Sequence, residues 1–126
     1  NRRAYPWGRE DVVMVDFHRD MIRIHKENEA FRTGSVKFLQ GEQDVLSYGR
    51  FNRKEQFVVI LNNSTGKKTL IQDVTGIGIP KEALLKRLII TTETGYSLMP
   101  EEYRVKDGKI EISMMPYSAV VLQCEK

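Results

Sequence analysis

The beginning of the chain carries apolar residues at the spacing of an amphipathic helix. Val13, Phe17, Met21 and Ile24 recur three or four positions apart, with polar and charged residues between them. Side chains at this spacing lie on the same side of an α-helix, so the pattern predicts a helix over residues 10–28. One face of that helix is apolar, and we expect it to be buried against another part of the protein.

The rest of the chain follows a different pattern. Short runs rich in Val, Ile, Phe, Tyr and Thr are separated by Gly, Asn, Asp and Pro, at intervals typical of an antiparallel β protein. Residues 81–86 are compatible with one helical turn or with none. We predict strands over residues 35–39, 44–52, 56–62, 67–74, 87–92, 102–106, 109–115 and 118–124.

Two of these runs are apolar at successive positions, as expected for strands in the middle of a sheet. They cover residues 57–61 and 119–122, and we expect them to form the core. The clearest turn is Asp107-Gly108, because both residues can adopt the positive φ values of a two-residue type I′ hairpin. The sequence therefore predicts one hairpin and two central strands.

The order of the elements indicates the organisation of the chain. A helix followed by strands predicts a mainly β fold, an antiparallel β-sandwich preceded by one amphipathic α-helix. The 126 residues are enough to bury a sizeable core but too few for several large domains. We expect residues 1–33 to belong to a separate domain and residues 34–126 to form the sandwich, with the boundary around Phe31 to Ser35.

Composition and charge argue against several classes of partner. The 20 basic and 17 acidic residues leave a net charge of +3 and are interspersed, so we expect no nucleic-acid partner. No run approaches the roughly 18 apolar residues that a membrane helix requires, so we expect no membrane partner. The opening Asn1-Arg2-Arg3 is neither a start methionine nor a signal peptide, and we expect the chain to begin within a longer protein.

Residues that could hold a metal or carry a modification are few. The single cysteine, Cys124, excludes an internal disulfide and a thiolate zinc site, and it suits a cytoplasmic location. His18 and His25 lie on the predicted helix without further ligands at metal-binding spacing, so we expect no metal and no cofactor. Asn62 and Asn63 each begin a glycan-acceptor motif, but a polar turn accounts for both.

Paired carboxylates are the next candidates for chemistry, because two carboxyl groups that face each other across a substrate can act as general acid and general base. Asp16 and Asp20 are one helical turn apart, but they lie beside arginines on the polar side of the predicted helix. Glu101 and Glu102 are adjacent at the start of a strand, where successive side chains point to opposite faces. We therefore expect no catalytic residue in this chain.

Three segments, taken together, resemble the C-terminal end of the alpha-amylase family in order and spacing. The similarity is greatest to the neopullulanase, cyclomaltodextrinase and maltogenic amylase branch, and it covers essentially the whole chain. The segments are Asn1-Arg2-Arg3-Ala4-Tyr5-Pro6-Trp7, then His25-Lys26-Glu27-Asn28-Glu29-Ala30-Phe31-Arg32-Thr33-Gly34, and finally Pro116-Tyr117-Ser118-Ala119-Val120-Val121-Leu122.

The resemblance implies that this chain is one part of a longer enzyme and that the catalytic groups lie in another part. Residues 10–30 would be the last helix of the family's catalytic (β/α)₈ barrel, and the residues from about 35 onward its C-terminal β-sandwich. The family's nucleophile, acid/base and stabilising carboxylate lie on earlier barrel loops, outside this chain. Asn1 and Arg2 match the end of a loop that borders the sugar subsites, although Ala4 stands where many relatives have proline. The resemblance thus implies Asn1 and Arg2 as substrate-binding residues in the parent enzyme.

Three functional hypotheses follow. The first is a non-catalytic domain that packs on and stabilises the barrel of a retaining glycosidase, which hydrolyses α-glucosidic bonds in maltodextrins, cyclodextrins or pullulan. The second is an oligosaccharide-binding module, in which aromatic side chains stack on sugar rings. Its candidate residues are Tyr48, Phe51, Tyr96 and Tyr103. The third is an assembly role: without the barrel, the apolar helix face should either form a dimer or fold back on the sandwich.

Overall fold

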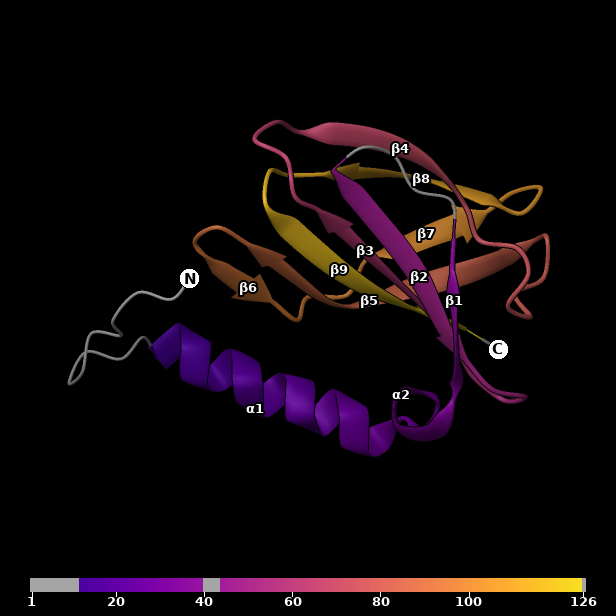
Figure 1. The fold of residues 1–126 in the computed structure, drawn as a ribbon, viewed down its shortest axis with the longest axis horizontal. Helices are drawn as coiled ribbons and strands as arrows, with labels where there is room; N and C mark the ends of the chain where they lie inside the picture. Colours follow the sequence, from indigo (N-terminus) through magenta and orange to yellow (C-terminus); the bar gives the residue numbers. More distant parts are fainter. Residues whose placement is uncertain (1–11, 40–43, 126) are drawn as a thin grey trace.

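The N-terminal part of the described chain is helical (Figure 1). The computed structural model describes residues 12–39 and 44–125, with the backbone alone described for residues 12–18 and 21. Helix α1 spans Val12–Glu27 and helix α2 spans Glu29–Thr33. Asn28 separates them in an extended conformation, and its side-chain amide donates to the carbonyl oxygen of Ile24 at 2.9 Å. The predicted helix over residues 10–28 is therefore present in its described part, and α2 is an addition that the sequence pattern did not indicate.

Strands occupy most of the remaining described residues. All of their pairings are antiparallel, which confirms the predicted fold class. The strands are β1 Ser35–Phe38, β2 Val45–Phe51, β3 Gln56–Asn62, β4 Lys68–Asp73, β5 Ala83–Thr92, β6 Gly95–Ser97, β7 Glu102–Val105, β8 Lys109–Met114 and β9 Ser118–Cys124.

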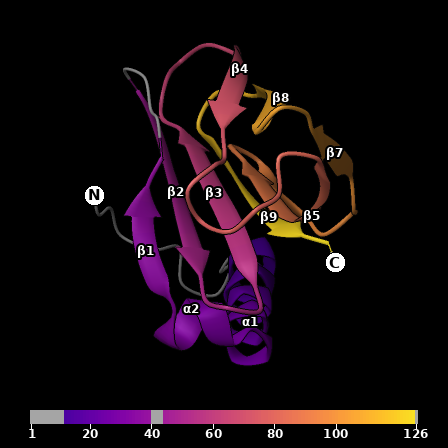
Figure 2. The same cartoon turned by 90° about the vertical axis from the view of Figure 1, so that its right-hand side faces the viewer.

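The described strands form two sheets of unequal size. The larger sheet has the order β1-β2-β3-β9-β5-β6, and β7 also pairs with β5. Both edge strands fit on β5 because it is long: residues 90–92 pair with β6 and residues 83–86 pair with β7. The smaller sheet consists of β4 and β8. Figures 1 and 2 show this small sheet on one side of the large sheet and α1 on the other side.

The main core lies between the two sheets. The central strands contribute Val58, Ile60, Val120 and Leu122, all fully buried. Burying these aliphatic side chains is the main favourable contribution to the stability of the sandwich. The predicted core strands are confirmed, because β3 and β9 are buried on both faces. The small sheet and the adjoining segments complete this core with Leu70, Val74, Ile77, Ile110, Ile112 and Met114.

A buried polar contact joins the two sheets inside this core. The hydroxyl of Ser47 on β2 donates to the side-chain carbonyl of Gln72 on β4 at 2.6 Å, and both residues are buried. The amide nitrogen of Gln72 donates in turn to the carbonyl oxygen of Asp73 at 2.9 Å. A buried polar group without a partner is costly, so this pairing favours one alignment of the two sheets.

The predicted hairpin at Asp107-Gly108 is confirmed. The two residues have φ angles of 54° and 80°, and Lys106 forms a bridge with Lys109 across the turn. A Cβ atom at position 108 would lie 2.5 Å from Cγ2 of Thr75, so glycine is required there by packing as well as by backbone conformation.

Residues 81–86, which were predicted to form one helical turn or none, contribute to a strand instead. Instead of a helical turn, β5 already begins at Ala83 and pairs with β7 through Lys86. The register shifts between Arg87 and Ile89, as in a β-bulge. The apolar positions on either side of the bulge therefore face different cores, which obscures the alternation expected of a strand.

Candidate functional site

The junction between the helices and the large sheet is the most extensively built feature outside the main core. Ile24 of α1 and Phe31 of α2 are buried against Phe57 of β3. The ring centroids of Phe31 and Phe57 lie 4.4 Å apart, and the ring of His25 stacks on that of Phe31 with a centroid distance of 5.2 Å. The cluster is completed by Ala30, Val59, Ile89 and Val121. We call this set of residues the helix–sheet junction.

Three polar contacts fasten the helices to the sheet around this apolar cluster. The Tyr96 hydroxyl on β6 donates to Oδ2 of Asp20 at 2.7 Å. The carboxylate of Glu55 accepts a hydrogen bond from the backbone N–H of Ala30 at 3.1 Å. The guanidinium of Arg50 donates to the carbonyl oxygen of Phe31 at 2.9 Å. These bonds join α1 and α2 to sites far apart in the sheet, so the helices are held at more than one point.

The Tyr96 contact corrects the expectation for Asp20. The sequence placed Asp16 and Asp20 together on the solvated side of the helix. Asp20 instead lies between α1 and β6, where it also pairs with Arg23 at 3.6 Å. Asp20 faces the β domain because the sheet partner of α1 includes the polar hairpin of β6 as well as apolar strands. The side chains of Asp16 and His18 lie outside the described residues.

A polar groove of about 620 Å³ lies beside the junction. It carries the carboxylates of Glu27, Glu29, Glu55 and Glu125, mixed with basic side chains. Within residues 12–39 and 44–125, no group of three or more potential metal ligands is found. The remaining lining residues are Arg32, Asn52, Lys54, Lys86, Gln123 and Cys124. Interspersed charges of this kind suit solvation or a polar protein contact.

The second acidic pair does not form a dyad. Glu101 accepts from Arg87 at 3.3 Å and from the hydroxyl of Tyr103 at 2.5 Å, whereas Glu102 stands opposite Lys86 on the neighbouring strand. Burial, and then the hydrogen bond to Glu101, raise the pKa of Tyr103 to about 12. Glu101 is therefore engaged in holding neighbouring side chains.

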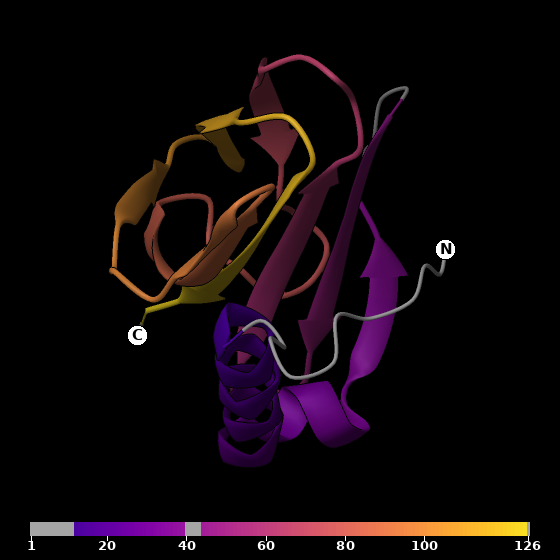
Figure 3. The same cartoon turned by 90° about the vertical axis from the view of Figure 1, so that its left-hand side faces the viewer.

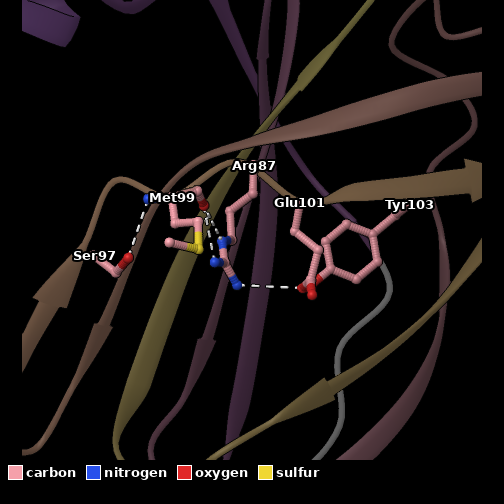
Figure 4. Close-up of polar contacts among 5 residues, drawn as sticks. All are labelled: Arg87, Ser97, Met99, Glu101 and Tyr103. Atoms are coloured by element: carbon pink, nitrogen blue, oxygen red, sulfur yellow. Dashed lines mark hydrogen bonds and ion pairs between the residues drawn. The ribbon is translucent and has the colours of Figure 1, made fainter.

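Arg87 organises the segment between β6 and β7 (Figure 4). Its guanidinium donates twice to the carbonyl oxygen of Met99, at 2.9 and 3.2 Å, and once to Glu101. The backbone N–H of Met99 donates to the hydroxyl of Ser97 at 3.0 Å. A planar guanidinium can satisfy several acceptors at once, so one side chain anchors the whole segment to β5.

The four aromatic candidates for sugar binding are less exposed than the sequence reading assumed. Tyr48, Phe51, Tyr96 and Tyr103 are all half-buried. Phe51 and Tyr103 pack on the main core, and Tyr48 and Tyr96 pack on the helix–sheet junction. The sequence reading did not single out Phe38, which is 68% exposed. Phe38 and Val36 are two positions apart and therefore lie on the same face of the strand. This spacing alone does not say whether that face is covered.

The remaining candidate residues differ in burial. Asn62 is buried and donates to the carbonyl oxygens of Gly66, Met114 and Met115, so its glycan-acceptor motif is inaccessible in the folded protein. Asn63 is exposed. Cys124 is buried, and its thiol lies 3.6 Å from the carbonyl oxygen of Glu125. Asn1 and Arg2, implied as substrate-binding residues, lie outside the described residues and stay a prediction.

Among the described residues, no helix is long and apolar enough to cross a membrane.

Comparison with known proteins defines the class of this domain. No family profile matches the chain. Its fold matches that of an alpha-amylase from Geobacillus thermoleovorans in complex with acarbose, with a TM-score of 0.76 and 17% identity. That match covers 100% of this chain and 26% of the other. An Anoxybacillus alpha-amylase gives a TM-score of 0.74 and 20% identity over 93% of this chain and 23% of the other. The architecture is thus that of the C-terminal β domain of alpha-amylases.

Curated relatives carry the same resemblance in sequence. An amylopullulanase from Thermoanaerobacter thermohydrosulfuricus is 27% identical over 133 aligned positions, which cover 97% of this chain and 8% of the relative. An amylopullulanase from Thermoanaerobacterium saccharolyticum is 26% identical over the same share of this chain and 10% of its own length. The chain therefore fits a C-terminal domain of an alpha-amylase-family enzyme and spans about a tenth or less of these relatives. The relatives are named amylopullulanase, and none of these matches specifies the neopullulanase branch.

Proposed function

We propose that this chain is the non-catalytic C-terminal domain of a glycoside hydrolase that acts on α-glucosidic bonds, and that its role is to pack on and stabilise the catalytic barrel. The relatives named amylopullulanase and the alpha-amylase structures support the enzyme class. In this proposal residues 1–33 belong to the barrel and residues 34–126 form the supporting domain.

The helix–sheet junction is the observation that carries the proposal. The resemblance equates α1 with the last helix of the barrel, and this helix is held on the β domain by Ile24 and by the bond from Tyr96 to Asp20. Apolar burial resists separation of the two layers, and the polar contacts fix their relative position. A domain joined in this way can hold a barrel helix in place without taking part in bond cleavage.

The acidic groups also support a non-catalytic role. A general acid near neutral pH needs a raised pKa. Hydrogen bonds from the Thr75 hydroxyl and backbone N–H instead hold the pKa of Asp73 below its usual 3.8. Asp20 and Glu101 are bound by tyrosine and arginine side chains. In the proposed enzyme, bond cleavage belongs to carboxylates of the barrel.

An activity assay on the purified chain tests this proposal. We expect no release of p-nitrophenol from p-nitrophenyl maltosides and no opening of β-cyclodextrin. Size-exclusion fractions of the 14.6 kDa chain should be assayed across the whole elution profile, so that a contaminating hydrolase is recognised by its different position. Turnover that follows the chain itself would refute the non-catalytic role.

A second candidate is oligosaccharide binding by the β domain. A hollow of about 660 Å³ beside the β5–β6 hairpin is lined by Tyr96 and by the hydroxyl-bearing residues Thr92, Thr94 and Ser97. An aromatic face with nearby hydroxyls can stack on a sugar ring and bond to it. Titration with maltoheptaose should then shift the amide signals of this hairpin. Unchanged amide signals at millimolar sugar would eliminate this candidate.

A further inference from the structure

The turn between β8 and β9 holds an aromatic residue in a backbone conformation that suits glycine. Tyr117 has a φ angle of 49°. Among the described residues, the other non-glycine residues with positive φ are Asp44 and Asp107. Aspartate tolerates this region because its short side chain can bond to nearby backbone groups, whereas a bulky tyrosine has no such compensation. A strained position of this kind points to a function of the side chain.

Burial of the Tyr117 side chain is incomplete. It is 45% exposed, and the nearby Met115 is 50% exposed. Of the aromatic residues that the structure describes, only Phe38 is more exposed. The four aromatic candidates from the sequence are half-buried, whereas Tyr117 offers an accessible aromatic surface.

The turn that carries Tyr117 is held from two sides. The hydroxyl of Ser118 donates to the carbonyl oxygen of Met115 at 2.6 Å and closes the turn. The backbone N–H of Tyr117 donates at 3.3 Å to the carbonyl oxygen of Ser64, in the turn between β3 and β4. Figures 1 and 3 show these two turns side by side and well away from α1. The backbone beneath the Tyr117 ring therefore has little freedom to move.

Asn62 joins the two turns from the inside. Its side chain is buried, and its amide nitrogen donates to the carbonyl oxygens of Met115 at 3.0 Å and Gly66 at 3.1 Å. Its amide oxygen accepts from the hydroxyl of Ser64 at 2.7 Å. One buried side chain thus bonds to both turns, so the exposed surface above it is organised before any ligand arrives. Such preorganisation lowers the entropic cost of binding.

No residue of the two turns carries a charge. They consist of Asn62-Asn63-Ser64-Thr65-Gly66 and Met115-Pro116-Tyr117-Ser118, in a chain of which 29% of the residues are charged. We call these residues the Tyr117 platform. Asn63 and Thr65 are exposed on it, and their amide and hydroxyl groups can donate and accept hydrogen bonds. The platform offers no ion pair to a phosphate or a carboxylate, and it suits a neutral ligand with many hydroxyl groups.

We propose that the Tyr117 platform binds a pyranose unit of an α-glucan chain. The Tyr117 ring stacks on the apolar face of the sugar, and Asn63 and Thr65 bond to its hydroxyl groups. The choice of a sugar rests on the platform, whereas the choice of an α-glucan rests on the proposed function. Because one exposed ring carries the stacking, binding is weak, with a dissociation constant on the order of 1 mM.

Amide shifts of the 126-residue chain during a titration with maltoheptaose test the site directly. We expect the signals of residues 62–66 and 115–118 to shift and to approach saturation at about 10 mM sugar. The absence of shifts in the platform at that concentration would overturn the proposal. Shifts confined to residues 92–97 would also overturn it, since the sugar would then lie on the β5–β6 hairpin.

Tyr117→Gly is the decisive variant, because glycine adopts a positive φ without strain while the ring is removed. The dissociation constant for maltoheptaose should rise at least about threefold, as expected for the loss of one stacking contact. Tyr117→Trp keeps an aromatic ring and should stay within about threefold of the original chain. Phe38→Ala is the matched control, since it removes an exposed aromatic residue outside the platform and should leave binding unchanged.

Asn63→Ala tests the polar half of the site at an exposed position where the fold should tolerate the change. Loss of a hydrogen bond to the sugar should raise the dissociation constant at least about twofold. Unchanged binding by either Tyr117→Gly or Asn63→Ala would refute the site. Amide signals outside the platform show whether each variant is folded.

Two control titrations separate this site from other ligands. Equal platform shifts with cellohexaose, a β-linked chain, would overturn the assignment to α-glucans. The same shifts on raising the concentration of the chain without sugar would identify a protein contact instead and overturn the sugar site.

The proposed function is tested separately by glucan hydrolysis in the longer protein. Hydrolysis there, together with a platform that does not respond to maltoheptaose, would overturn the platform proposal alone. Platform shifts from a longer protein without α-glucosidic hydrolase activity would overturn the proposed function, while the sugar site would stand.

Discussion

Replacement of Phe31 by alanine is the most informative single change at the helix–sheet junction. The side chain is 7% exposed, and its ring lies 4.4 Å from that of Phe57 and 5.2 Å from that of His25. Loss of a buried phenylalanine side chain usually costs about 3–5 kcal/mol, from lost burial and the cavity that remains. Phe31 lies at the edge of the fold, where neighbours can close in, so we expect about 3 kcal/mol for Phe31→Ala.

Urea unfolding and amide hydrogen exchange together measure this cost. Because α1 and α2 can separate from the sheet before the sandwich unfolds, we expect the amides of α1 to lose more protection than those of β3. The matched control is Ile22→Ala, since Ile22 lies on α1 and is 56% exposed. Its effect should stay within about 0.5 kcal/mol. A loss of less than about 1 kcal/mol for Phe31→Ala, or equal losses for the two variants, would refute the reasoning.

Three further predictions concern single polar groups. Because the pKa of Tyr103 is raised to about 12, its contribution to stability should be complete below pH 10 and disappear as the pH rises through about 12. Ultraviolet titration should show tyrosine ionisation that continues to about pH 12, and Tyr103→Phe should reduce this late part; a titration complete near pH 10 would contradict this. Because the pKa of Asp73 is lowered in the folded state, its contribution to folding stability should be present above about pH 4. This contribution should decrease as the pH falls through the folded-state pKa. The pH dependence of its carboxyl carbon shift in NMR should give a pKa below 3.8 for Asp73. A pKa at or above 3.8 would show that the Thr75 hydrogen bonds do not form in solution. Asn62→Ala leaves buried carbonyl groups without hydrogen-bond donors, so the free energy of unfolding in urea should fall by about 2–4 kcal/mol. A change within about 0.5 kcal/mol would rule out the role of Asn62 as a hydrogen-bonding centre.

Local patterns were sufficient for most of the secondary structure. The periodicity around Ile24 and the apolar runs of β3 and β9 predicted one amphipathic helix and two central strands, and the structure has all three. The Asp107-Gly108 turn was equally readable, because its backbone requirement is local. By contrast α2 and β6 were missed, since short elements depend on their neighbours for stability.

The candidate site was much less accessible to sequence reasoning. Asp20 and Tyr96 are 76 positions apart, and only the folded chain brings them into a hydrogen bond. Tyr48 is half-buried because it packs on the helix–sheet junction, whereas Phe38 is exposed, and the strand pattern distinguishes neither case. The pattern of a strand states that one face is apolar, but it does not state what covers that face.

The sequence by itself therefore determined the mainly β fold, the central strands and the resemblance to the alpha-amylase family, because periodicity, turn residues and short motifs are local properties of the chain. Only the tertiary structure decided which carboxylates are engaged and which aromatic residues are covered. Those features arise from contacts between residues distant in sequence, and their free energies depend on burial that exists only after the sheets and helices have packed.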